Sequence, residues 1–251
     1  MRELEGYVAL VTGGPKNIGR AMALELAGAG ASVVITALTN LAGARDVAGE
    51  IEKSGGQALA AACDVTSEAG VGALHDEIAA RFVRLDILIN NAAVRHETPF
   101  EQMTFAQWRQ VTSVILDGAF LTAHAMLPLL KASGRGAIIN LGGLSAYTGA
   151  KNRVHVLAAK SGLGGLTRGL AHDLAAYDIT ANLVAPGLID TARGGSSSAQ
   201  EPDHHRHHST LVGRRGRPQE VAGMVRWLAG PGARYITGQT IHVNGGAFLP
   251  T

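Results

Sequence analysis

The lysine at position 160 is the first residue whose type and surroundings suggest chemistry. It stands in NRVHVLAAKSGLGGLT, residues 152–167, a segment of mostly small residues with the pattern of a helix start. A cation among small apolar residues costs free energy unless it has a polar partner or a ligand. One helical turn earlier, on the same face, stands Val156, which can neither hydrogen-bond the lysine nor share a proton with it. The purpose of Lys160 must therefore come from other parts of the chain.

A glycine-rich turn near the N-terminus is the second chemically informative pattern. The sequence TGGPKNIG, residues 12–19, follows an apolar run and precedes a helical pattern. The free N–H groups and the dipole at a helix N-terminus favour an anion such as a phosphate. Gly13 permits a tight turn, and Gly19 lets the helix pack close to the sheet. The strand–turn–helix context makes this match more specific than the glycines alone.

The elements that must position these residues alternate along the chain. Helix-length segments, such as 18–28 and 41–54, have apolar residues three and four apart and separate short apolar runs. The expected strands are residues 7–12, 32–37, 58–65, 85–91, 136–141, 179–186 and 239–243. Strands without polar alternation, separated by helices, predict a parallel sheet covered on both faces. No repeat or linker divides residues 1–251, so we expect a single α/β domain.

The composition excludes several classes of protein. Hydrophobic residues make up 46% and charged residues 17% of the chain, which is typical of a globular protein. A formal charge of only +2, with basic residues scattered and 4% aromatics, argues against nucleic-acid binding. No uninterrupted apolar run approaches the roughly 18 residues that a membrane span needs. The N-terminus is too weakly apolar for a signal peptide, and the single Cys63 suits a reducing compartment. We expect a soluble cytoplasmic protein.

One polar segment departs from the alternating pattern. Residues 192–212, ARGGSSSAQEPDHHRHHSTLV, are rich in Ser, Gly and His. The run HHRHH, residues 204–208, offers imidazoles that could bind a metal, but a mobile surface loop is the simpler interpretation. We therefore predict no metal site. A long polar loop late in such a fold is also a candidate substrate lid.

Further short motifs follow the glycine turn in a fixed order: CDVT at 63–66, NNAA at 90–93, VAPGLIDT at 184–191 and YITGQTIHVNGG at 235–246. Together they resemble the signatures of the short-chain dehydrogenase/reductase family over essentially the whole chain. The resemblance implies a Rossmann-type, doubly wound sheet of about seven parallel strands that binds NAD(P) at the carboxyl ends of its strands. The implied cofactor-binding residues are Gly13, Lys16, Asn17, Ile18, Gly19, Asp64, Val65, Asn90, Ala92, Lys160, Pro186, Gly187, Ile189 and Thr191.

The resemblance also implies roles for these residues. Gly13 and Gly19 receive the pyrophosphate, Asp64 the adenine amine and Asn90 the adenosine ribose. The carboxamide of the nicotinamide is held by the residues after the sixth strand, which are Pro186, Gly187, Ile189 and Thr191. Two positions depart from the family pattern. Asn17 replaces the middle glycine of the turn, which should survive because Asn tolerates left-handed backbone, and Ala93 replaces the final glycine of NNAG.

The second strand indicates which nicotinamide cofactor is preferred. An acidic residue at its end would bind the ribose hydroxyls of NAD and repel a 2′-phosphate. This chain has Ala37, Leu38 and Thr39 there, and Lys16 stands where NADP-using relatives often carry a basic residue. Lys16 also has a plain interpretation as a solvated lysine. We expect NADP(H) to be favoured over NAD(H).

The usual catalytic set of the family is largely missing. It consists of a Tyr four residues before a Lys, a Ser that polarises the substrate oxygen and an Asn on the preceding helix. Lys160 matches the family lysine and would hold the nicotinamide ribose. However, Val156 occupies the Tyr position, Gly143 the Ser position and Ile115 the Asn position. The usual carbonyl mechanism therefore cannot operate unchanged.

The replacements resemble those of one divergent branch, the 2,4-dienoyl-CoA reductases, which lack the Tyr but keep the Lys. The matching features are His155, five residues before Lys160, and Asp117, two residues after the lost Asn. In that branch the proton donor tends to come from the loop before the helix, where this chain offers Ser145 and Tyr147. His155 could equally be a helix-start histidine bonded to backbone, and Asp117 an ordinary solvated carboxylate. Reducing a conjugated C=C leaves an enolate, which needs charge stabilisation and a later proton at carbon.

Three functions follow for a small-molecule substrate. The leading hypothesis is an NADP(H)-dependent reductase of a conjugated enoyl, dienoyl or similar compound. The second is an ordinary ketone, 3-oxoacyl or alcohol oxidoreductase in which Tyr147 or His155 replaces the lost Tyr. The third is a nucleotide-binding sensor or scaffold without catalysis. His96, after NNAAVR, lies where substrate-facing loops begin. The family resemblance also implies a homotetramer, with interfaces at residues 100–130 and 150–175 and at the last strand.

Overall fold

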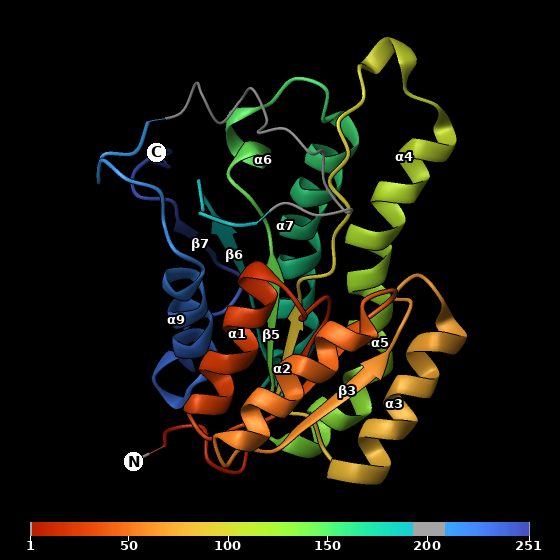
Figure 1. Cartoon of the computed structure of the whole chain (residues 1–251), viewed down its shortest axis with the longest axis vertical. Helices are drawn as coiled ribbons and strands as arrows, with labels where there is room; N and C mark the ends of the chain where they lie inside the picture. Colours follow the sequence, from red (N-terminus) through yellow and green to blue (C-terminus); the bar gives the residue numbers. More distant parts are fainter. Residues whose placement is uncertain (1, 193–208, 251) are drawn as a thin grey trace.

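Seven apolar strands form one parallel sheet, and each lies within a segment predicted to be a strand. The computed structural model describes residues 2–192 and 209–250 (Figure 1). The strands are β1 (Val8–Val11), β2 (Ser32–Ala37), β3 (Ala58–Ala62), β4 (Ile87–Asn90), β5 (Ala137–Leu141), β6 (Thr180–Pro186) and β7 (Thr240–Val243). Their order is β3-β2-β1-β4-β5-β6-β7, and every pairing is parallel. The chain reverses direction across the sheet between β1 and β4, where a doubly wound sheet leaves a crevice for a ligand.

Helices cover both faces of the sheet, as the alternating pattern predicts. They are α1 (Asn17–Gly28), α2 (Leu41–Lys53), α3 (Glu68–Phe82), α4 (Phe105–Thr112), α5 (Gly118–Ser133), α6 (Ser145–Thr148), α7 (Val154–Leu174) and α9 (Pro218–Ala229). α1 packs between α2 and α9 on one face, while α3 packs on α5 and α4 on α7 on the other (Figure 1). The domain is a single Rossmann-type unit.

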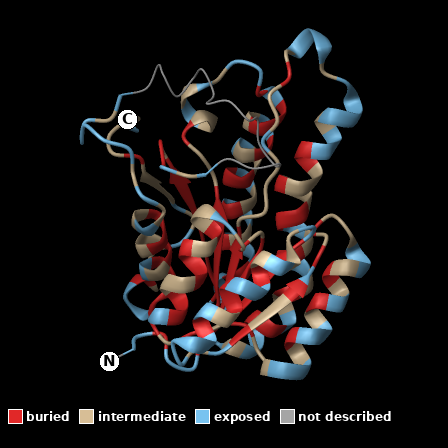
Figure 2. Ribbon diagram, in the orientation of Figure 1, coloured by how far each residue is buried: buried red, intermediate tan, exposed pale blue. Residues whose placement is uncertain are grey.

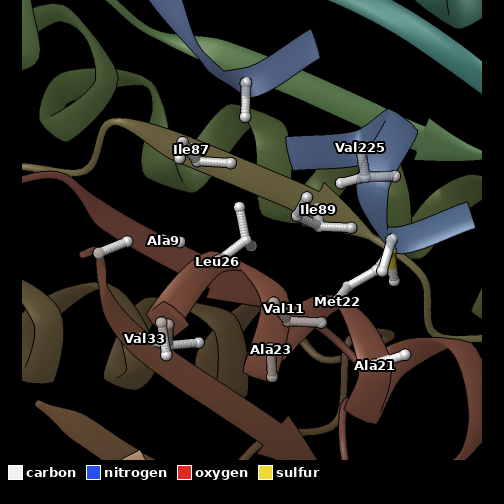
Figure 3. Close-up of a cluster of buried hydrophobic side chains, with 14 of the residues drawn as sticks. Ala9, Val11, Ala21, Met22, Ala23, Leu26, Val33, Ile87, Ile89 and Val225 are labelled. Carbon is white, nitrogen blue, oxygen red and sulfur yellow. The ribbon is translucent and has the colours of Figure 1, made fainter. Parts of the chain in front are cut away.

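The alternation of side chains along each strand divides the core into two layers. In β1, Ala9 and Val11 join the layer of α1 and α9, whereas Val8 and Leu10 join that of α3 and α5. Figure 3 shows the first layer, where Met22 and Leu26 of α1 and Val225 of α9 lie over the strands. Figure 2 shows that the inner strands and the inward helix faces are mostly buried, whereas the edge strands β3 and β7 are partly exposed. Both faces of every central strand are covered, which is why the strands read as continuous apolar runs.

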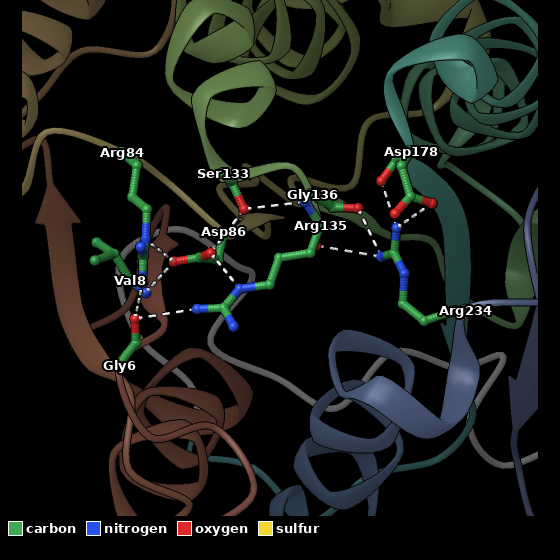
Figure 4. Close-up of polar contacts among 9 residues, drawn as sticks. All are labelled: Gly6, Val8, Arg84, Asp86, Ser133, Arg135, Gly136, Asp178 and Arg234. Atoms are coloured by element: carbon green, nitrogen blue, oxygen red, sulfur yellow. Dashed lines mark hydrogen bonds and ion pairs between the residues drawn. The ribbon is translucent and has the colours of Figure 1, made fainter.

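A buried carboxylate ties together the amino ends of the strands, away from the crevice. Asp86 is fully buried, and its carboxylate accepts hydrogen bonds from the Val8 amide at 2.7 Å and the Ser133 hydroxyl at 2.7 Å. It also pairs with Arg84 at 3.3 Å and Arg135 at 2.9 Å (Figure 4). A buried carboxylate is tolerated when its lone pairs are satisfied in this way, so the network holds β1, β4 and the end of α5 in place.

α4 and α5 form one continuous helix with an internal bulge. Residues Ser113–Asp117 between them adopt π-helical geometry. The helix Phe105–Ser133 is long and apolar enough by length and composition to span a membrane, because an 18-residue window within it has a mean hydropathy of 1.5. Met126 and Leu130 on its inner face are fully buried against the sheet. This packing is that of a core helix, which satisfies the same criteria.

Candidate active site

The glycine turn has the close backbone contacts that a phosphate cradle requires. Gly13 has φ +63°, and a Cβ there would lie 2.9 Å from the Ala92 Cα. A Cβ on Gly19 would lie 2.6 Å from the Gly13 carbonyl oxygen, too close for any side chain. The turn therefore brings bare backbone to the start of α1, where amide groups and the helix dipole favour an anion. These residues fit a dinucleotide pyrophosphate, with Ile18 in the first turn of α1.

Two residues outside the predicted site hold this turn against the next strand. The Thr12 hydroxyl accepts hydrogen bonds from the Asn91 and Ala92 amides at 3.0 and 3.1 Å. The Asn91 side chain in turn donates to the carbonyls of Thr12 and Gly13, both at 2.9 Å. The sequence patterns gave no role to Thr12 or Asn91, although Thr12 belongs to TGGPKNIG and Asn91 to NNAA. They position the cradle across the point where the sheet changes direction.

Asn17 keeps the turn intact and also fastens it to a distant segment. Its φ of +51° confirms that this residue adopts the left-handed backbone that was expected where the family has glycine. Its side chain donates to the Ala192 carbonyl at 2.7 Å and accepts from the Ala192 amide at 3.0 Å. This bidentate contact joins the cradle to the segment after β6. Lys16 is the exposed N-cap residue of α1, and its side chain caps no amide.

The residues predicted for the adenosine half lie at the carboxyl ends of β3 and β4. Asp64 is half-buried, and one of its oxygens accepts from the Thr66 amide at 2.9 Å and hydroxyl at 2.7 Å. Val65 is buried beside it. The Asn90 side chain donates to Asn140 at 2.9 Å inside the protein, so its amide group connects β4 to β5.

The segment after β6 is folded back against the end of β7. The Gly187 amide donates to the Val243 carbonyl at 2.9 Å, and a Cβ on Gly187 would lie 2.6 Å from the Asn244 Cα. The Pro186 carbonyl accepts from the Leu144 amide at 2.9 Å, which brings the segment after β5 alongside. Ile189 is buried and Thr191 is half-buried. The backbone here thus lies at the crevice edge, where the nicotinamide end was predicted.

Lys160 lies on α7 with its ammonium at the end of β5. Its Nζ donates a hydrogen bond to the Leu141 carbonyl. Burial lowers the pKa of Lys160 to about 7, and the nearby Arg95 and Arg153 lower it in the same direction. A group with a pKa near neutrality can hold or release a proton under physiological conditions. Lys160 is therefore a candidate for proton transfer itself, as well as for binding a ribose.

The three residues that the sequence analysis placed at the catalytic positions of the family do not form a polar relay. Ile115 and Val156 are both 2% exposed, and they belong to one apolar cluster with Leu183 of β6. Both side chains are apolar and pack in the same cluster, so neither leaves a buried polar group without a partner. Gly143 differs from these two, because a Cβ there would meet nothing within 4 Å. The space at Gly143, where the sequence analysis expects the family serine, is thus open.

The two proton donors proposed from the loop before α7 lie in α6. The Tyr147 ring packs edge-on to His242 with a centroid distance of 4.6 Å, and it also contacts Phe248. Its hydroxyl donates to the Thr240 hydroxyl at 3.5 Å. This tyrosine therefore lies against β7 and the C-terminal segment. Ser145 is half-buried at the start of α6.

The structure separates the remaining candidates. His155 is fully buried in the first turn of α7. Desolvation lowers its pKa most, a hydrogen bond to the Arg153 backbone raises it, and the charges of Arg153 and His96 lower it by smaller amounts. Asp117 lies at the end of the π-helical segment and pairs with Arg109 at 3.4 Å on a largely exposed surface. His155 is thus near Arg153 and His96, whereas Asp117 belongs to the outer face of α4 and α5.

The predicted lid and the histidine run fall largely outside the described residues, which omit 193–208. Arg95 and Arg153 were not predicted as site residues. The sequence signals that could have identified them are their positions: Arg95 follows NNAAV directly, and Arg153 directly precedes VHV.

The crevice lies at the reversal point of a doubly wound sheet, fits a dinucleotide and has a lysine at its edge. Together these features define a nicotinamide-dependent oxidoreductase. The chain matches the family described as "Enoyl-(Acyl carrier protein) reductase" over residues 13–247. It belongs to the short-chain dehydrogenase/reductase family, as the motifs predicted.

Curated relatives extend over its whole length. The chain is 38% identical over 247 residues to the 3-oxoacyl-(acyl-carrier-protein) reductase FabG of Aquifex aeolicus, covering 98% of this chain and 99% of that protein. It is 35% identical to the FabG of Escherichia coli, covering 98% of each. Among solved structures, a dehydrogenase/reductase from Sinorhizobium meliloti 1021 superposes with a TM-score of 0.91 at 35% identity, covering 99% of this chain and 97% of the other.

Proposed function

We propose that this protein is an NADP(H)-dependent oxidoreductase that reduces the ketone of a 3-oxoacyl or similar compound, with Lys160 transferring the proton. The observation that carries the proposal is the position of Lys160, at the crevice edge with a pKa of about 7, in a chain similar over its full length to 3-oxoacyl reductases. The proposal takes its reaction from the second of the three hypotheses drawn from the sequence rather than from the first, but makes Lys160 the proton donor instead of Tyr147 or His155.

The proposed chemistry needs few groups from the chain. When bound, the cofactor supplies a hydride to the carbonyl carbon. The Lys160 ammonium, which now donates to the Leu141 carbonyl, donates instead to the ketone oxygen and gives up its proton as charge develops there. The open space at Gly143 admits the substrate, and the apolar wall that includes Val156 keeps water away from the amine. No tyrosine is needed, because an amine with a pKa near 7 is itself a suitable acid.

The cofactor preference rests on charge at the start of α1. Lys16 is exposed at the N-cap, and β2 ends with Ala37 followed by exposed Leu38 and Thr39, so no carboxylate there repels a 2′-phosphate. We expect Lys16→Gln to weaken NADPH binding about tenfold, as for loss of one charge-assisted hydrogen bond, and to leave NADH binding unchanged. Fluorescence titration of both cofactors measures this, and equal losses for the two would contradict the role of Lys16.

The decisive experiment follows NADPH consumption with acetoacetyl-CoA, ethyl acetoacetate and crotonyl-CoA. Turnover of the first two supports the ketone reductase. Turnover of crotonyl-CoA alone would support the enoyl or dienoyl reductase. We include this substrate because the matching family is described as an enoyl reductase. Cofactor binding without any turnover would support the sensor.

Three variants separate the candidate donors. Lys160→Met should abolish ketone reduction, whereas Tyr147→Phe should retain most of it because the phenol is occupied at Thr240. Loss of turnover in Tyr147→Phe with NADPH affinity intact would make Tyr147 the donor instead, and the same result in His155→Gln would favour His155.

The proposal includes a cytoplasmic homotetramer. Its support is an exposed apolar surface on the long helix, where Phe105 is 76% and Phe120 is 50% exposed. An open groove of about 430 Å³ lies beside Phe120, between α5, α7 and the start of α3. A monomer by light scattering at micromolar concentration would contradict this part of the proposal.

A further inference from the structure

The side chain of Asn17 connects two segments that are far apart in the sequence and that are expected to hold different parts of the cofactor. Asn17 lies in the turn between Gly13 and Gly19, where the diphosphate is expected. Ala192 directly follows Thr191, the last residue expected at the nicotinamide. The Asn17 side chain donates to the Ala192 carbonyl at 2.7 Å and accepts from the Ala192 amide at 3.0 Å. The pair therefore joins the two cofactor-binding segments directly.

The order of the strands shows how far the segment after β6 reaches to make this contact. β4 and β5 lie between β1 and β6, so β1 and β6 are about 14 Å apart at the usual strand spacing. α1 follows β1, and residues 187–192 follow β6. Six extended residues span at most about 20 Å, which is enough for this distance. The segment therefore returns past the carboxyl ends of β5 and β4 to the start of α1.

Main-chain hydrogen bonds hold the middle of this segment in extended form. The Asp190 amide donates to the Gly216 carbonyl at 2.8 Å, and the Gly216 amide donates to the Leu188 carbonyl at 2.9 Å. Gly216 lies just before α9, which packs on α1. Leu188, Asp190 and Ala192 are each two residues apart, so in an extended segment their main-chain groups face the same side. The Asn17 side chain thus continues, at Ala192, the pairing that Gly216 begins.

Asparagine adds this contact without disturbing the turn. The φ of Asn17 is +51°, a conformation that glycine adopts freely and asparagine tolerates better than most residues. A glycine here would keep the same backbone and would lose both hydrogen bonds to Ala192. Asn17 is half-buried and Ala192 is exposed, so the pair lies at the surface and can open without exposing the core. The contact can therefore be removed by mutation while the turn is kept.

We propose that the pair of Asn17 and Ala192 closes one side of the crevice over the cofactor diphosphate, so that Asn17 governs how fast the cofactor enters and leaves. This inference goes beyond the proposed reduction, because it concerns retention of the cofactor and holds whichever substrate is reduced. A cofactor held both at the glycine turn and at residues 186–191 lies inside the loop that the pair completes. The pair must then open for the diphosphate to pass in either direction.

The test is a stopped-flow measurement of cofactor binding and release, followed by the fluorescence of NADPH. Release is started by displacing bound NADPH with an excess of NADP⁺. We expect Asn17→Gly to raise the rate constants of both binding and release about tenfold, as for the loss of two exposed hydrogen bonds. The dissociation constant should change much less, because it is the ratio of two rate constants that rise together. No substrate is needed, so failure of ketone reduction does not affect this test.

A second left-handed asparagine provides the matched control. Asn152 has a φ of +60° and is exposed just before α7. Asn152→Gly makes the same chemical change on the same kind of backbone and should leave both rate constants unchanged. NADH supplies a further control, because it carries the diphosphate but no 2′-phosphate. Asn17→Gly should accelerate its release by the same factor, whereas Lys16→Gln should act on NADPH alone.

Three results would overturn the inference. The first is an unchanged rate of NADPH release from Asn17→Gly, which would mean that the pair opens faster than the cofactor leaves. The second is faster release without faster binding, which would make Asn17 an ordinary contact of the bound cofactor. The third is an effect on NADPH that NADH does not show, which would assign the role of Asn17 to the 2′-phosphate.

Discussion

The pH dependence of ketone reduction tests the central assignment, because it distinguishes a perturbed lysine from an ordinary one. The proposed donor is the ammonium form of Lys160, whose pKa lies at about 7 instead of the usual 10.5. The protonated fraction is then about one half at pH 7, about one tenth at pH 8 and about one hundredth at pH 9. A lysine of ordinary pKa would remain about 97% protonated at pH 9. At pH 9 the expected rates for a perturbed and an ordinary lysine therefore differ by roughly a hundredfold.

The assay is single-turnover reduction with NADPH in excess, so that product release does not mask the chemical step. The wild-type rate should fall about tenfold per pH unit above pH 7. Arg95→Gln removes one of the cations that lower this pKa, so its falling limb should move to higher pH. Lys160→Arg cannot lose its proton in this range, and any residual rate should not depend on pH. A wild-type rate that stays constant to pH 9 would refute the assignment of Lys160 as the acid.

Stability gives an independent check with a defined sign. The folded protein lowers the pKa of Lys160, so between about pH 7 and 10.5 the unfolded chain binds more protons than the folded one. The contribution of this residue to the free energy of unfolding therefore increases as the pH rises through that window. Lys160→Met should remove that increase in urea unfolding, and an unchanged pH profile in this variant would argue against burial of the amine.

Three further outcomes follow from the packing. Gly19→Ala should weaken NADPH binding more than tenfold, because its Cβ would lie 2.6 Å from a backbone oxygen, while Gly28→Ala in the same helix has open space and should bind normally in the same titration. Asp86→Asn should lower the free energy of unfolding in urea by about 3 kcal/mol, because it breaks a buried ion-pair network, whereas exposed Asp46→Asn should change it by less than about 0.5 kcal/mol. Asn17→Ala should cost about 1–2 kcal/mol in the same assay, because alanine is strained at a φ of +51°, and a variant as stable as wild type would contradict that strain.

Much of the fold was predictable because its signals are local. Apolar runs of strand length and helical spacing depend on neighbouring residues, and all seven strands lie within the predicted segments. The tight glycine turn was predictable for the same reason, since Gly13 and Gly19 serve a single turn between β1 and α1. Some strand boundaries were not predictable. The third strand ends at Ala62 rather than at residue 65, and Asp64 lies beyond it.

The sequence by itself determined the parallel sheet and the tight glycine turn between β1 and α1, and it set Val156 one helical turn before Lys160. Only the tertiary structure decided what surrounds Lys160. It placed Tyr147 against β7, packed Ile115 on the same apolar wall as Val156, and brought Arg95 beside α7. The segments that follow parallel strands all begin at the same edge of the sheet, so residues far apart in the chain lie close together there. Which side chains then share an environment depends on packing between those segments, and no local pattern encodes it.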